Sequence, residues 1–258
     1  MKLSYICPTQ YIKEFQGQSD FILALAHLID LNSINAYEQA ILDTKLPIWL
    51  DNSCFEQKMP VGIDELVLKA KKIGAELLVA PDFLYNKKST QRAIANTRYI
   101  MKRHNFDCKM MVVCQAKTKT EYLQFYKELC ENDQVDVIGL SILAIPHVYS
   151  TTNQTKCRIE FMQDCLKMQD VNHKQCHLLG AGNTFEDALF AKQYCPWIKS
   201  NDSSSAFWHG IQLQKINEQL EVEGGKTQVK VNFDFKHADA KQLRLAQKNI
   251  DILKQQLS

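Results

Sequence analysis

Two aspartates, Asp51 and Asp202, are the residues of this sequence best suited to chemistry, because each closes a short apolar run. Two carboxylates that meet at one site can act on a glycosidic bond, where one attacks or stabilises the sugar and the other carries a proton. An Asp or Asn after a strand is also a common helix cap or turn residue. Four further polar residues follow other apolar runs within one to three positions: Asp82, Gln115, Ser141 and Asn183.

The elements before these side chains determine where they lie. Short, uniformly apolar runs predict strands over residues 3–7, 46–50, 76–80, 109–114, 135–140, 175–180 and 197–200, with an eighth near 227–233. Amphipathic segments predict helices over 62–73, 89–104, 118–131, 158–168 and 184–193, and a C-terminal helix over 238–257. Strands that are apolar throughout are typical of a sheet covered on both faces.

The alternation of strands and helices predicts a parallel sheet. At 258 residues we expect one domain, residues 1–258, folded as an α/β protein of the (β/α)8 TIM barrel type. A doubly wound open sheet is the alternative. In a barrel the carboxyl ends of the strands converge on one face, where the catalytic groups of such enzymes lie. The six polar side chains are therefore expected in a single mouth.

Composition excludes several classes of protein and of site. Lys plus Arg is 31 against 29 Asp plus Glu, so the net charge of +2 provides no bulk attraction to nucleic acid. The nine cysteines form no Cys-x-x-Cys pair, which indicates reduced thiols in the cytoplasm and no metal site. His173 and His177 straddle the start of a predicted strand and are expected to be ordinary histidines. No apolar segment is long enough to span a membrane, and we expect a soluble protein without a cofactor.

A Gly-x-Gly turn follows the predicted strand at 175–180. Gly180, Gly182 and Asn183 run into a predicted helix, and such a turn lets backbone N–H groups approach a phosphate. The same two glycines also suit a tight turn between a strand and a helix. Both interpretations stay open at this point.

The ordered series of motifs resembles the tRNA-guanine transglycosylase superfamily, (β/α)8 enzymes that exchange a guanine in nucleic acid for a 7-deazaguanine base. The similarity runs from about residue 48 to residue 210 and lies in the order of the pieces. Leu50-Asp-Asn-Ser-Cys-Phe-Glu is similar to the family's Asp-Ser-Gly-Gly-Phe/Tyr-Gln, whose aspartate is the general acid/base, and the resemblance gives that role to Asp51. Ser200-Asn-Asp-Ser falls at the family's nucleophilic aspartate, which corresponds to Asp202.

The remaining motifs imply residues that bind the base or the nucleic acid. Val79-Ala-Pro-Asp, Val113-Cys-Gln and Val137-Ile-Gly-Leu-Ser resemble the segments in which the family contacts the purine. His177-Leu-Leu-Gly-Ala-Gly resembles the family's His-x-Leu-Gly-Val-Gly. The resemblance implies base contacts from Asp82, Gln115, Gly139, Leu140, Ser53, Phe55 and Glu56. The predicted nucleic-acid or phosphate contacts are Gly180, Gly182, Asn183, Ser203, Lys199 and His209, with a structural role as the alternative for His209.

Departures from the family pattern bear on the substrate. Ser53 and Cys54 replace its paired glycines, and Glu56 replaces its glutamine. The tRNA enzymes carry a C-terminal Cys-x-Cys-x-x-Cys and a later His that bind zinc, whereas no cysteine follows Cys195 here. A compact barrel without the zinc-binding subdomain resembles the DNA-directed branch known from bacteriophages and bacteria. Lysines expected to supply local phosphate contacts, or else to be solvated helix residues, are Lys71, Lys72, Lys87, Lys88, Lys117, Lys119 and Lys199.

The resemblance therefore predicts a DNA guanine transglycosylase. Its partners would be DNA and a 7-deazaguanine base such as 7-cyano-7-deazaguanine, and the intermediate would be a covalent Asp202–sugar ester. The same exchange on tRNA is the second interpretation. The residues are also compatible with a barrel enzyme that acts on a sugar or phosphorylated metabolite, and with a non-catalytic nucleic-acid-binding relative. A homodimer or an accessory protein is expected as the source of any further nucleic-acid contacts.

Overall fold

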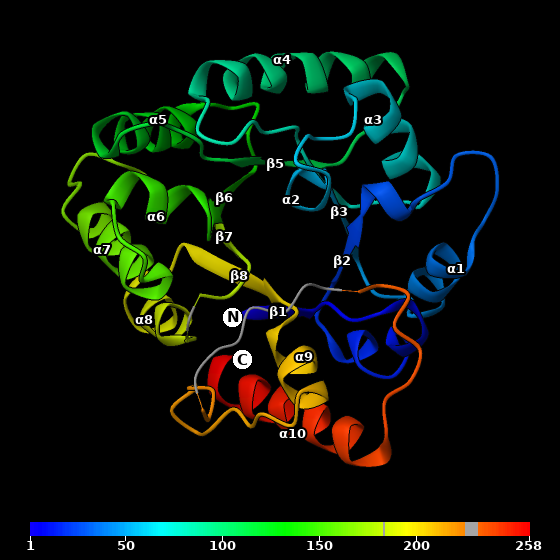
Figure 1. Ribbon diagram of the computed structural model, residues 1–258. Coiled ribbons are helices and arrows are strands. Elements are labelled where there is room, and N and C mark those ends of the chain that lie inside the picture. Colours follow the sequence, from blue (N-terminus) through cyan, green and yellow to red (C-terminus); the bar gives the residue numbers. More distant parts are fainter. Residues whose placement is uncertain (183, 225–231) are drawn as a thin grey trace.

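Eight parallel strands form a nearly closed barrel in the computed structural model, which describes residues 1–182, 184–224 and 232–258 (Figure 1). The strands are β1 Lys2–Tyr5, β2 Ile22–Leu25, β3 Ile48–Asp51, β4 Leu77–Val79, β5 Lys109–Val113, β6 Val137–Ser141, β7 Cys176–Leu179 and β8 Ile198–Ser203. Their hydrogen-bonded order is β1-β8-β7-β6-β5-β4-β3-β2. The predicted single-domain (β/α)8 barrel is confirmed.

Helices surround the strands (Figure 1). They are α1 Ala36–Asp43, α2 Cys54–Gln57, α3 Ile63–Lys72, α4 Lys87–Arg103, α5 Lys119–Glu131, α6 Ala144–Tyr149, α7 Gln154–Leu166, α8 Glu186–Tyr194, α9 Ser205–Ile211 and α10 Ala240–Leu257. Short 3-10 helices cover Thr9–Tyr11, Gln16–Gln18 and Ala26–Leu28. Side chains that accept a backbone N–H in the first turn start five of the longer helices: Asn35, Asn86, Thr118, Asn153 and Asp239. Within the described residues, no helix has the length and apolarity needed to cross a membrane.

Side chains along the strands alternate between two apolar layers. One cluster fills the inside of the barrel: Phe21, Leu23, Trp49, Leu77, Val79, Met111, Val113 and Val137. Their neighbours in sequence, such as Ile22, Leu50 and Val112, belong to the larger core between strands and helices. Both faces of the strands are therefore buried, which is why the sequence shows uniformly apolar runs.

The eighth strand differs from the one that the sequence predicted. It is β2, whose residues Ile22–Leu25 are all buried and pair with β3. Two short 3-10 helices connect β1 to β2, so no amphipathic helix precedes this strand to reveal it. Of the strand predicted at 227–233, residues 227–231 lie outside the described residues, and Asn232 and Phe233 are not in a strand.

Side chains help to close the barrel between β1 and β2, the two ends of the hydrogen-bonded order. The Leu3 and Tyr5 N–H groups donate to Asp20 Oδ2 and Ser19 Oγ at 2.8 and 2.9 Å. The Leu23 N–H donates to Ser4 Oγ at 3.2 Å. Side-chain oxygens thus satisfy backbone donors along this seam.

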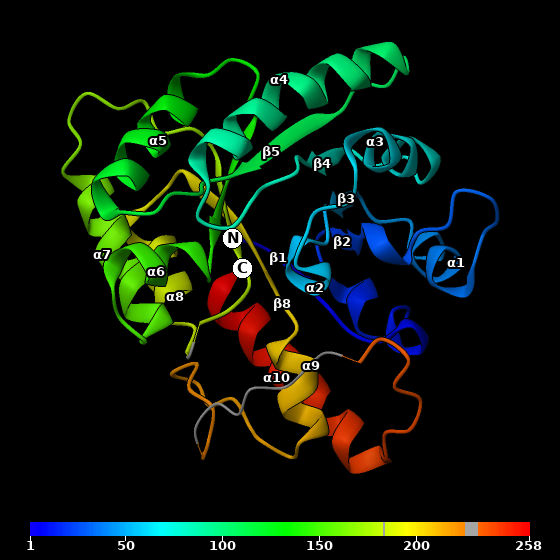
Figure 2. The same ribbon diagram turned by 45° about the horizontal axis from the view of Figure 1, so that its top comes forward.

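The predicted C-terminal helix packs against the barrel as α10, beside α9 (Figures 1 and 2). Its buried side chains include Ala246, Ile250 and Leu253. Gly210 of α9 lies so close that a Cβ there would be 2.3 Å from the Ala246 Cα. The two helices therefore pack backbone against backbone at this point.

Candidate active site

The carboxyl ends of the strands bring five of the six predicted polar residues to one end of the barrel. Asp51 and Ser141 end β3 and β6, and Asp202 is the second-last residue of β8. Asp82 and Gln115 follow β4 and β5 by three and two residues. Helix α2 begins just after β3 and lies inside the ring of outer helices in Figure 1. The sixth predicted residue, Asn183, lies outside the described residues.

Asp51 belongs to a group of interacting carboxylates. Its Oδ2 accepts a hydrogen bond from the Ser53 N–H at 2.7 Å. Burial raises the pKa of Asp51 well above its usual range, the charge of Glu56 raises it further, and Asp82 and Asp202 make smaller contributions of the same sign. Carboxylates from four separate segments therefore share one region. A carboxyl group whose pKa is raised holds its proton more firmly and is better suited to act as a general acid.

Asp82 and Gln115 form a buried hydrogen-bonded pair. Asp82 Oδ2 accepts from Gln115 Nε2 at 2.5 Å, and its Oδ1 accepts from Asn52 Nδ2 at 2.8 Å. Gln115 Oε1 in turn accepts from the Tyr85 N–H at 3.0 Å. Burial raises the pKa of Asp82, and these two side-chain hydrogen bonds counteract part of the rise. Each carboxylate oxygen has a second lone pair, so Asp82 can still accept a hydrogen bond from a ligand.

Asp202 is held through one of its two oxygens. Its Oδ1 accepts from the Gly180 N–H at 3.1 Å and lies 2.9 Å from His177 Nε2. Among the residues that the structure describes, none makes a hydrogen bond to Oδ2. The Asp202 side chain is 7% exposed. One carboxylate oxygen is therefore fixed and the other is left for a ligand.

The segment around α2 contributes three predicted residues in three different settings. Ser53 is buried, and its Oγ contacts the backbone N–H and the ring Nδ1 of His27 at 3.1 and 2.9 Å, so its hydroxyl is already bonded within the protein. Phe55 is 66% exposed. Glu56 Oε2 is buried and has no hydrogen-bond partner among the described residues, and burial raises the pKa of this carboxyl. Glu56 and Phe55 are thus available to a ligand, whereas Ser53 is engaged.

Gly139 and Leu140 of β6 have packing roles in the barrel. A Cβ on Gly139 would lie 2.8 Å from Leu179 Cδ1 and 3.1 Å from Val113 Cγ2. The Leu140 side chain is fully buried in the core between strands and helices, and the Leu140 carbonyl accepts from Arg158 Nη1 at 3.4 Å. Any contact of this segment with a base would therefore come from the backbone.

The two glycines of the Gly-x-Gly turn have conformational and packing reasons to be glycine. Gly180 has φ of +73°, in the left-handed region that favours glycine. A Cβ on Gly182 would lie 2.3 Å from Thr155 Oγ1 of α7. These features favour the tight-turn interpretation, although the Gly180 N–H points at Asp202 and so takes part in the site.

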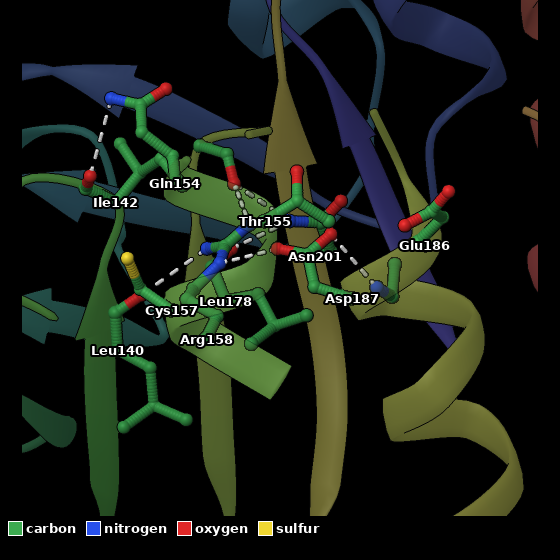
Figure 3. A network of polar contacts seen from close by, with 12 residues as sticks. Leu140, Ile142, Gln154, Thr155, Cys157, Arg158, Leu178, Glu186, Asp187 and Asn201 are labelled. Carbon is green, nitrogen blue, oxygen red and sulfur yellow. Dashed lines mark hydrogen bonds and ion pairs between the residues drawn. The ribbon is translucent and has the colours of Figure 1, made fainter. Parts of the chain in front are cut away.

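A buried network around Arg158 supports this turn (Figure 3). Arg158 of α7 forms an ion pair with Asp187 of α8 and donates from Nη2 to the Gly180 carbonyl at 2.8 Å. Asn201 Nδ2 donates to the Leu178 carbonyl at 2.8 Å, which ties β8 to β7 beside the same turn. The carboxyl end of β7 is therefore held by one side chain from α7 and another from β8.

Three predicted nucleic-acid contacts are not available to a nucleic acid at this end of the barrel, one because it lies at the opposite end and two because they are buried. Lys199 lies three residues before Asp202, roughly 10 Å back along the strand. It lines a cavity of about 700 Å³ with Lys2 and Lys109, which start β1 and β5, so this cavity is at the opposite end. His209 is 1% exposed and its Nδ1 lies 2.8 Å from Gln214 Oε1, which favours its structural alternative. Ser203 is buried, and its Oγ accepts the Ser205 N–H at the start of α9.

Several lysines that were expected to contact phosphates form ion pairs within the protein. Lys87 lies 2.8 Å from Glu128 and Lys119 lies 2.5 Å from Asp164, while Lys72 pairs with a buried glutamate of α1. Their charges are therefore partly compensated. A nucleic acid would have to compete with these carboxylates for them.

Three residues of the site were not predicted as such. His177 was expected to be an ordinary histidine, yet it is fully buried against Asp202. Asn52 donates a hydrogen bond to Asp82, and Arg158 donates one to the Gly180 carbonyl. These contacts join residues at least 22 positions apart, so the spacing of residues in the sequence does not reveal which side chains meet.

Among the described residues, no group of three or more His, Cys, Asp or Glu side chains is placed to hold a metal ion. Comparison with known proteins adds no relative: no protein-family model matches the chain, and no curated protein matches it.

Proposed function

We propose that this protein is a DNA guanine transglycosylase, which exchanges a guanine in DNA for a 7-deazaguanine base. The observation that carries the proposal is the pairing of two different carboxylates at one end of the barrel. Asp51 has a raised pKa, whereas Asp202 has one oxygen fixed and the other unbonded among the described residues. Retaining chemistry at a glycosidic carbon needs these two roles, a proton carrier and a nucleophile.

In the proposed reaction, Asp202 Oδ2 attacks C1′ of the target nucleotide. The C1′–N9 bond breaks, its electron pair stays on N9 of guanine, and Asp51 supplies the proton that N9 takes up. The enzyme then carries the sugar as an ester of Asp202. Asp51, now ionised, removes the N9 proton of the incoming base, N9 attacks C1′, and the ester bond to Asp202 breaks.

The neighbouring side chains are suited to the donor-rich edge of guanine. Asp82 is buried, and each of its carboxylate oxygens retains a lone pair for an N–H donor. Glu56 Oε2 is a second buried acceptor without a partner among the described residues. A base that presents N1–H and an exocyclic amino group would satisfy both acceptors. Exposed Phe55 offers a ring for stacking.

The choice of DNA over tRNA rests on the resemblance to the compact branch of the superfamily. In a duplex the sugar C1′ and the base edges are shielded, so the target nucleotide would have to be flipped out or presented in a single strand. Exchange of this kind on DNA would take place in the cytoplasm of a bacterium or of an infected host cell.

The experiment is incorporation of a radiolabelled 7-deazaguanine base into DNA and tRNA, side by side. We expect label in DNA with wild-type protein and none with Asp202→Asn. Asp133→Asn, a change at an exposed carboxylate, is the matched control and should behave as wild type. Label in tRNA alone would make tRNA the substrate, and wild-type incorporation by Asp202→Asn would refute the mechanism.

Asp51 is tested separately. Loss of a general acid costs typically 10²–10⁴-fold in rate, so Asp51→Asn should slow exchange by about that factor while DNA binding is retained. A denaturing gel should reveal a DNA–protein adduct in the wild type without added base. Turnover of small glycosides in the absence of nucleic acid would instead favour a sugar-directed enzyme, and binding without an adduct a non-catalytic protein.

A further inference from the structure

We propose that His177 and Ser200 form a positioning pair that holds Asp202 Oδ1 and leaves Oδ2 to attack the sugar. This role rests on the proposed function, in which Asp202 is the nucleophile. His177 lies between the other two side chains, with Nδ1 2.8 Å from Ser200 Oγ and Nε2 2.9 Å from Asp202 Oδ1. His177 and Ser200 are fully buried. Neither reaches the solvent, so both act through Asp202.

The strands place the three side chains in line. His177 of β7 is the register partner of Ser200 of β8, and Asp202 lies two residues further along β8. Residues two apart on a strand point to the same side of the sheet. The imidazole therefore has a hydroxyl at one ring nitrogen and a carboxylate at the other.

Hydrogen-bond chemistry determines the tautomer of His177. An ionised carboxylate only accepts, so Nε2 must carry the proton that is donated to Asp202. In a neutral imidazole Nδ1 is then an acceptor, and the Ser200 hydroxyl is its donor. Asp202 thereby selects the tautomer, and Ser200 supports it by donating to Nδ1.

Aromatic packing holds the ring itself in one orientation. The imidazole meets Phe21 and Trp49 edge to face, with ring centroids 5.9 and 5.4 Å apart and interplanar angles of 74° and 73°. Phe21 and Trp49 are stacked on each other at 3.8 Å. Rotation of the imidazole out of line with Asp202 would disrupt this packed interior.

The tautomer can be measured on the wild-type protein by NMR after ¹⁵N labelling of histidine. We expect His177 to carry its proton on Nε2, and we expect Ser200→Ala to shift the ¹⁵N resonance of Nδ1, because this nitrogen loses its hydrogen-bond donor. A wild-type ring protonated on Nδ1 alone, or on both nitrogens, would overturn the pair. An unchanged His177 signal in Ser200→Ala would do the same.

Two substitutions of His177 separate positioning from packing. His177→Phe keeps a planar ring but removes both hydrogen bonds, and it should lower kcat for base exchange by about 10–100-fold, as loss of a supporting group typically does. His177→Gln keeps an N–H donor for Asp202 and should recover at least about tenfold of that loss. The affinity for DNA should stay within about twofold in both, because neither side chain contacts the nucleic acid.

Wild-type kcat in His177→Phe would overturn the positioning role. So would a His177→Gln variant that is no more active than His177→Phe at equal melting temperature. Failure of the proposed function is distinguishable, because wild-type protein would then exchange no base in DNA or tRNA. The tautomer measurement needs no substrate and would still test the hydrogen-bonded pair.

Discussion

Arg158 Nε lies 2.5 Å from Asp187 Oδ2, and each of the two side chains is only 1% exposed. The same guanidinium donates to the carbonyls of Leu140, Leu179 and Gly180, at the ends of β6 and β7 (Figure 3). One buried cation thus connects α7 and α8 to the strand ends beside Asp202. Such a pair is costly to form but more costly to break from one side.

The first prediction concerns this ion pair. Asp187→Asn removes the negative charge and leaves Arg158 buried without its counter-ion, so the free energy of unfolding should fall by about 3 kcal/mol. Urea unfolding followed by circular dichroism measures the change. Asp133→Asn, at an exposed position, should stay within about 0.5 kcal/mol of wild type. Equal effects of the two substitutions would contradict the role of the pair.

A second prediction concerns the contact between α9 and α10. Gly210→Ala would place a Cβ against the Ala246 backbone at 2.3 Å, and the helices would have to move apart. Overpacking of this kind typically costs about 1–3 kcal/mol. Gly62→Ala is the matched control, because its added Cβ meets no atom within 4 Å and its φ of −57° suits alanine. Thermal unfolding should show a lower Tm for the first variant only.

The free energy of unfolding should fall as the pH rises, because the buried carboxyl groups at the carboxyl ends of the strands lose their protons. Burial raises the pKa values of Asp51, Glu56 and Asp82, so the folded state holds these protons to higher pH than the unfolded chain does. The contribution of these carboxyls to the free energy of unfolding therefore decreases with rising pH. The decrease begins at about pH 4, the pKa of a carboxyl in the unfolded chain, and continues through the raised pKa values of the folded state.

Asp51→Asn tests this sign. The amide cannot ionise, and its oxygen can still accept the Ser53 N–H, so the variant should be more stable than wild type at pH 8. The expected gain is about 1 kcal/mol, which is common for stabilising changes at functional sites. The gain should shrink at pH 5. A variant that is less stable than wild type at pH 8 would show that Asp51 contributes to folding in its ionised form.

Phe55 provides a prediction about nucleic-acid binding. Its ring is 66% exposed, so Phe55→Ala should leave the Tm almost unchanged. If a base stacks on this ring, its loss should weaken DNA binding by about 1–3 kcal/mol. Tyr99 of α4 is also 66% exposed and gives a matched control, Tyr99→Ala, which should bind DNA as wild type does. Fluorescence anisotropy with a labelled oligonucleotide compares the two, and equal affinities would exclude stacking on Phe55.

Much of the architecture can be predicted from the sequence because both layers around each strand are apolar. Seven of the strands lie in runs that are apolar over several consecutive residues, and the connecting helices carry one apolar face each. β2 escaped prediction because the connection before it consists of 3-10 helices. Lys199 was predicted at the wrong end of the barrel, although the sequence was enough to place it correctly. It lies three positions before Asp202 on the same strand and therefore toward the opposite end.

The sequence by itself determined that Asp51, Asp82, Gln115 and Asp202 would lie at one end of the barrel, since parallel strands bring their carboxyl ends to the same side. Only the tertiary structure decided what these groups touch. The register of β7 on β8 sets His177 beside Ser200 and Asp202, and helix packing brings Arg158 to Asp187 and Gly180. Such contacts depend on strand register and helix packing between distant segments, which short-range patterns of residue type do not encode.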